Sequence, residues 1–165
     1  MPRRCRGAAV LEALPSHTAA YLAGFVDGDG SIFLTRRKRF NTWILFVQLG
    51  GVGIEFIRSL HAECGSPGCV NVRIPKSAKR KKCAIWTMTG LTAVTFLRAI
   101  RPWLRLKRDQ AETALTFHSI MIEGGRPGER RYTELQQEQR HALFAQMQKL
   151  NAITGHSRSP RTANA

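Results

Sequence analysis

Two carboxylates stand two residues apart between glycines, in the segment YLAGFVDGDGS at residues 21–31. The chain has only three aspartates, and Asp27 and Asp29 are two of them. Mg²⁺ is typically held by one or two protein carboxylates together with phosphate oxygens, and a metal so placed can activate water against a phosphodiester. The segment therefore predicts a metal site. The alternative is an Asp-Gly-Asp-Gly turn, in which both aspartates only cap and bend the chain.

Small residues recur every four positions just before these carboxylates, at Ala20, Gly24 and Gly28. On a helix this spacing gives one smooth face, which a second helix can approach until the two backbones nearly touch. If the second helix belongs to another copy of the chain, both Asp29 side chains come close to a common axis. Such neighbouring carboxylates repel each other unless a cation lies between them.

The charge balance indicates the class of partner. The 165 residues include 26 Lys and Arg against 11 Asp and Glu, a net charge of +15. A basic domain of this kind favours nucleic acid over a membrane surface, because no helix opposes a purely apolar face to a Lys/Arg face. Cys64 and Cys69 are spaced for a zinc site, but no second ligand pair follows them, so free thiols are the preferred reading.

Hydrophobic periodicity places these residues on elements. We expect a loose arm over 1–16, one domain over 17–153 and a disordered tail over 154–165. Thr18 is a good N-cap for the first helix, which Gly28 and Gly30 should end. Helices are predicted near 54–61, 92–100, 107–122 and 132–150, and strands at 31–37, 43–49, 70–74 and 83–89. Hairpin-linked strand pairs predict an α+β domain with one antiparallel sheet and helices on one face.

The predicted strands carry polar side chains suited to the major groove of DNA, where base edges are read by hydrogen bonds. A basic loop between the second pair of strands is suited to phosphates, which position a protein without specifying sequence. The alternative is a solvated, charged hairpin tip. The candidate DNA-binding residues are Ser31, Thr35, Arg37, Arg39, Asn71, Arg73, Lys76, Lys79, Arg80, Lys81 and Lys82.

The segment LAGFVDGDG, residues 22–30, resembles the LAGLIDADG motif of homing endonucleases, with six of its nine positions identical. The order of predicted elements from residue 18 to about 122 is similar to the αββαββα core of that family. Residues 102–111 resemble the segment that opens its later helix. The resemblance implies a curved antiparallel sheet that forms a DNA-binding saddle, with further helices at the C-terminus.

The resemblance also implies roles. Asp29 would bind the metal, with the Gly28 carbonyl as a further ligand, and Mg²⁺ would be the ion, with Mn²⁺ or Ca²⁺ able to replace it in binding. Lys107 matches a basic residue that polarises the scissile phosphate or its solvent. Gln48 is the only polar candidate for a water-ordering residue, and it stands outside the usual register. The dimer interface would include Ala20, Ala23, Gly24 and Asp27.

Since one motif is present, the chain is similar to the homodimeric branch, and we expect a metal-dependent staggered double-strand cut in a long pseudo-palindromic site. The rival hypotheses are a catalytically weak DNA-binding regulator and an RNA maturase that binds its own intron. No run of eighteen apolar residues is present, so no membrane partner is expected. The expected location is the cytoplasm or nucleoid of a prokaryote, or the interior of an organelle.

Overall fold

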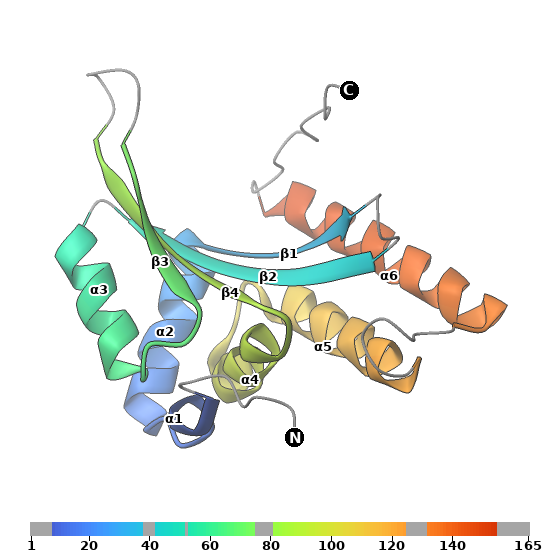
Figure 1. Cartoon of the computed structure of the whole chain (residues 1–165), viewed down its shortest axis with the longest axis horizontal. Coiled ribbons are helices and arrows are strands. Elements are labelled where there is room, and N and C mark those ends of the chain that lie inside the picture. The colour runs from blue at the N-terminus through green and yellow to red at the C-terminus, as the bar shows by residue number, and fades with distance from the viewer. Residues whose placement is uncertain (1–7, 38–41, 52, 75–80, 125–131, 155–165) are drawn as a thin grey trace.

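The computed structural model describes residues 8–37, 42–51, 53–74, 81–124 and 132–154. Figure 1 shows a single curved sheet with the first five helices on one of its faces and the last helix beside them, beyond strand β1. The elements are, in chain order, α1 (Ala8–Glu12), α2 (Ser16–Asp29), β1 (Gly30–Arg37), β2 (Thr42–Gly51), α3 (Ile54–Glu63), β3 (Cys69–Arg73), β4 (Cys83–Thr89), α4 (Gly90–Ile100), the 3₁₀ turn η2 (Arg101–Trp103), α5 (Arg108–Glu123) and α6 (Glu134–Ile153).

The four strands form an antiparallel sheet in the order β1-β2-β4-β3. Their side chains alternate between a face packed on the helices and an open face. The packed face is apolar and is fully buried on the central strands and β1, as at Ile32, Val47 and Met88, whereas Val72 of β3 is 38% exposed. One row across the open face joins Ser31, Gln48, Thr87 and Cys69 as register partners. The α+β class and the αββαββα order are therefore confirmed.

The turn from α2 into β1 explains the last glycine of the motif. A Cβ on Gly30 would lie 2.6 Å from the Val26 Cα and 2.8 Å from its carbonyl oxygen, so a larger residue cannot be placed there without moving backbone. The Gly30 N–H bonds the carbonyls of Phe25 and Val26 and closes the helix. Gly30 thus lets the strand leave the helix directly, immediately after Asp29.

The start and end of this helix differ from the prediction. The helix begins at Ser16 after Pro15, whose fixed φ suits a helix entry, so Thr18 is an internal residue and not the N-cap. Gly28 lies within the helix, which continues to Asp29. The expected loose arm over residues 1–16 is also wrong for its described part. Residues 8–12 form α1, whose Leu11 is fully buried and belongs to the core.

Helix α6 packs against α5 and reaches the edge of the sheet. The Asn151 side-chain amide donates to the Ile32 carbonyl at 3.0 Å, which satisfies one exposed backbone group of the edge strand β1. The helix begins with a capping box in which Thr133 and Gln136 each bond the other's backbone N–H. Residues 134–153 are therefore an integral part of the domain.

Candidate active site and nucleic-acid interface

Asp27 joins the end of α2 to the segment that precedes α5. Its carboxylate accepts three backbone N–H bonds, from Arg105 at 2.8 Å, Leu106 at 3.2 Å and Lys107 at 2.8 Å. These three N–H groups lie just before and at the start of a helix, where no helical carbonyl is available to them. We call this arrangement the Asp27 clamp. It connects positions that are 78 to 80 residues apart in the sequence.

Lys107 completes this junction from the other side. Its side chain is only 2% exposed, and its Nζ donates to the carbonyls of Val26 and Asp27 at 2.7 Å each. A cation at this place favourably meets the negative end of the α2 dipole. Burial lowers the pKa of Lys107 below its ordinary value, while the nearby charges of Asp27 and Asp29 oppose that change. The ammonium has three protons, so these two bonds leave one for water or for a ligand.

Asp29, in contrast, is exposed at the very end of α2. Gly28 beside it is also exposed, and a Cβ added there would meet nothing within 4 Å. Gly28 stands in the last turn, where a helix has no following N–H to bond its carbonyls. A carboxylate and a carbonyl are the hard oxygen donors that Mg²⁺ prefers, so the residues present fit this ion.

Protein groups alone do not complete a metal centre in one subunit. Within the described ranges, no three His, Cys, Asp or Glu side chains lie close enough to hold an ion together. Mg²⁺ commonly accepts such a site when phosphate oxygens and waters supply its remaining ligands. A second Asp29 from another copy of the chain would serve the same purpose.

Gln48 lies on the open face of the sheet. Its register partner is Ser31, which follows Asp29 by two residues in the sequence. Its side-chain amide donates to the Thr87 hydroxyl at 3.2 Å. Its Oε1 is buried, yet no group in the described part of the chain donates a hydrogen bond to it. An unsatisfied buried amide oxygen costs about 1–3 kcal/mol, so this acceptor is suited to a bound water or ligand.

The exposed side of α2 has open space along its length. Gly24 is exposed, and a Cβ there would meet nothing within 4 Å, so packing inside this subunit does not require a glycine at that position. Ala20 and Asp27 are half-buried at the edges of this face. The proposed interface role of Ala23 is wrong, because this residue is 0% exposed and lies in the subunit's own core.

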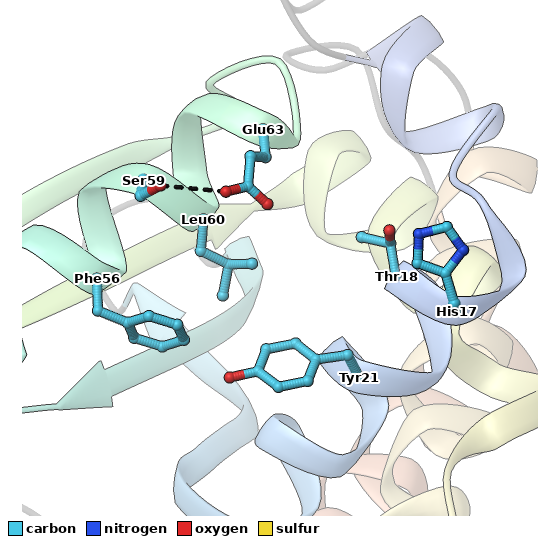
Figure 2. Close-up of a pocket in the computed structure, with 7 residues that line it drawn as sticks. All are labelled: His17, Thr18, Tyr21, Phe56, Ser59, Leu60 and Glu63. Atoms are coloured by element: carbon cyan, nitrogen blue, oxygen red, sulfur yellow. Dashed lines mark hydrogen bonds between the residues drawn. The ribbon is translucent and has the colours of Figure 1, made fainter.

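Apolar side chains border the same face. Tyr21 is 53% exposed, and its ring makes an edge contact with Phe56 of α3, which is 46% exposed. Leu106, in the loop held by the Asp27 clamp, is 59% exposed. Figure 2 shows the open groove that runs beside Tyr21 and Phe56 between α2 and α3. It is lined by His17, Thr18, Tyr21, Phe56, Ser59, Leu60 and Glu63.

The candidate DNA-binding residues are distributed as follows. Ser31 and Thr35 lie on the open face of β1, and Asn71 and Arg73 lie on the same face of β3 and are exposed. Lys81 and Lys82 are exposed immediately before β4. Arg37 belongs to β1 by its backbone, and its side chain is outside the described part. Arg39, Lys76, Lys79 and Arg80 also lie outside the described residues.

Two features of the site were not foreseen from the sequence. The Asp27 clamp could not be read from spacing, because its partners are about 80 residues away. The inward face of β2 was undecided, since nearly all its residues are apolar. The structure turns Phe46 to the open face, where its ring stacks on that of Phe33. The alternation of Phe33 with Ile32 and Leu34 was the available signal for the first of these rings.

No family model and no curated protein sequence matches this chain. Solved structures do resemble it. The homing endonuclease I-CvuI, in complex with its target in the presence of Ca, superposes with a TM-score of 0.56 at 18% identity over 91% of this chain and 87% of that one. I-GzeII, a LAGLIDADG homing endonuclease in complex with its DNA target, gives a TM-score of 0.61 at 13% identity, covering 89% of this chain and 53% of its own.

The meganuclease I-AabMI, bound to uncleaved DNA, gives a TM-score of 0.58 at 15% identity over 89% of this chain and 52% of its own. At such identities the likeness establishes the architecture. This chain spans most of I-CvuI and about half of I-GzeII and I-AabMI. Among the described residues, no helix is long and apolar enough to cross a bilayer. The chain therefore has the fold of the LAGLIDADG homing endonucleases, and its own LAGFVDGDG segment forms the end of the first long helix of that fold.

Proposed function

We propose that the chain is a site-specific DNA endonuclease that acts as a homodimer and makes a staggered, Mg²⁺-dependent cut in both strands of a long pseudo-palindromic site. One observation carries the proposal. A buried lysine and a three-bond carboxylate clamp fix the end of α2, and the exposed Asp29 that ends this helix makes no hydrogen bond or ion pair among the described residues. Rigid support around an exposed acid is characteristic of a site built to bind.

A homodimer is supported by the single LAGFVDGDG segment and by the surface of α2. The open positions at Gly24 and Gly28 allow a second α2 helix to approach closely. Tyr21, Phe56 and Leu106 are exposed, and the second subunit would bury them at the same contact. Because the contact is two-fold symmetric, each subunit would present one Asp29 to one DNA strand.

The residues would act as follows. When bound, Mg²⁺ would supply an activated water and stabilise the departing 3′ oxygen. Asp29 and the Gly28 carbonyl would hold the ion at the end of α2, and Lys107 would direct its remaining N–H toward the scissile phosphate or its solvent. Gln48 would order a water through its buried, unpaired Oε1. The open face of the sheet, with exposed Asn71 and Arg73, would lie along the major groove.

The test is cleavage of a DNA that contains the intron-free form of the host gene, with Mg²⁺ or with EDTA. A linear product that appears only with Mg²⁺, and that Asp29→Asn abolishes without loss of binding, is the expected result. The matched control is Asp109→Asn, the remaining aspartate of the chain, which lies exposed in the first turn of α5. Tight, salt-sensitive binding without any cut by the wild-type chain would overturn the nuclease proposal and favour a regulator.

A further inference from the structure

The open face of the sheet carries apolar side chains where a solvated face should be polar. Phe33 and Phe46 are register partners, and their rings stack with centroids 5.2 Å apart and planes within 3°. Ile44 lies opposite Thr35 on the next row, and Ile85 lies opposite Gly50 on the other side of the polar row. We call Phe33, Ile44, Phe46 and Ile85 the apolar patch.

This composition is unusual for the position. An antiparallel sheet with one face on the core normally shows polar residues on its other face. Here the strongly apolar members are half-buried, and in the described part of the chain no helix lies over that face. Stacking buries the ring faces that Phe33 and Phe46 turn toward each other. The patch adjoins the polar row of Ser31 and Gln48, so it belongs to the same surface.

We propose that the apolar patch reads thymine in the target by contact with the 5-methyl group. This inference rests on the proposed function, because it assumes that the open face lies in the major groove. A phenylalanine or isoleucine side chain has no hydrogen-bond donor or acceptor, so it cannot read the polar edges of guanine, adenine or cytosine. The thymine methyl is the one apolar group that the major-groove edge of a base pair presents.

Electrostatics favour the same occupant. The chain has a net charge of +15, and exposed Arg73, Lys81 and Lys82 lie at the end of the strands that carry Ile85. Such residues bind phosphates and would hold the duplex against the Ile85 end of the sheet. A phosphate itself would not be placed over two stacked rings, since it would lose its hydration there without gaining a partner. The base edges, and not the backbone, are therefore the part of the DNA that meets the patch.

The experiment uses the full chain and a randomised duplex pool, selected for binding in Ca²⁺ so that the DNA is bound. The best duplex is then resynthesised with uracil in place of thymine, one symmetry-related pair at a time, which removes only the methyl groups. Loss of a pair of buried methyls, one in each half-site, is expected to weaken binding roughly 15-fold, which is about fourfold for each methyl. Phe46→Gln should abolish this sensitivity, and Phe46→Leu, which stays apolar, should keep it.

Three results would count against the proposal. Equal binding of the thymine and uracil duplexes at every position overturns it while leaving specific DNA binding intact. The Phe33→Gln and Phe46→Gln variants are each checked for native circular dichroism. If both still bind the thymine duplex more tightly than the uracil duplex, other residues recognise the methyl group, and the role of the stacked rings is overturned. If no duplex is enriched above the pool, the DNA-binding proposal itself fails and takes this inference with it.

Discussion

Asp27 and Asp29 stand two residues apart on one helix, yet Asp27 accepts three backbone hydrogen bonds and Asp29 is exposed, so the same isosteric substitution should affect them differently. Asp27→Asn removes the charge and replaces one acceptor oxygen by an amide group. In either orientation that group faces at least one backbone N–H of the clamp, because both carboxylate oxygens accept such bonds. One or two of the three bonds are therefore lost, and a donor is left against a donor.

The magnitude follows from the type of bond. Hydrogen bonds to a charged group contribute about 1.5–3 kcal/mol each when they are well shielded. Solvent reaches the Arg105 and Leu106 bonds, so we discount each to about 1 kcal/mol. Asp27→Asn should then lower the free energy of unfolding by about 2 kcal/mol. Asp29→Asn should change it by less than about 0.5 kcal/mol, because the side chain is exposed.

The assay is urea unfolding of both variants and the wild type at one protein concentration, followed by circular dichroism. With a slope of about 2 kcal/mol per molar urea, Asp27→Asn should move the midpoint by about 1 M, and Asp29→Asn should leave it nearly in place. Cleavage should show a different order, with Asp29→Asn inactive although stable. Equal midpoints for the two variants would refute the reasoning, since the clamp would then contribute nothing to the junction of α2 with α5.

Three further outcomes are expected. Lys107→Met keeps the buried aliphatic part of the side chain but loses the two hydrogen bonds to α2 carbonyls. It should slow single-turnover cleavage about 100-fold. An unchanged cleavage rate would mean that Lys107 contributes to packing and not to catalysis. Gly24→Gln fits the open space within the subunit, so sedimentation should show a folded monomer, and a persistent dimer would place the interface elsewhere. Burial raises the pKa of Cys64 from 9.0 to about 11, so stability tied to the neutral thiol is complete below pH 9 and is lost as pH rises toward 11. Between pH 8 and 10 the wild type should lose about 1 kcal/mol more than Cys64→Ala, measured by urea unfolding at each pH, and parallel curves would contradict the assignment.

Local patterns were sufficient for most of the fold. Alternation along residues 31–35 predicted the first strand, because side-chain period is a local property. The second strand extends through Gly50 and Gly51, two glycines that locally favour a break, because both are paired with β4. The N-terminal arm failed for a tertiary reason. Residues 8–12 are a short apolar run that would not be helical alone, and the burial of Leu11 stabilises them as α1.

The candidate site likewise has a part that local sequence predicts and a part that depends on tertiary contacts. Asp29 could be proposed from one contiguous segment, because the small and acidic residues lie within a single helix, and the resemblance of that segment added the Gly28 carbonyl. The support that holds them could not, since Asp27 and Lys107 are brought together only when the segment before α5 docks on the end of α2. Ala23 was expected at the interface from the resemblance alone, and it stands one residue before Gly24 of the small-residue face, on the side of α2 that packs in the core.

The Asp27 clamp also has a consequence for the order in which the protein is made. The end of α2 is held by backbone groups at 105–107 and by the Lys107 ammonium, so a nascent chain shorter than this has nothing to fix the direction of Asp29. The last strand of the sheet ends at Thr89, so all four strands are synthesised before the residues that fix the end of α2. If the proposed function holds, a chain released before Lys107 would lack this support for Asp29 and should not cut DNA.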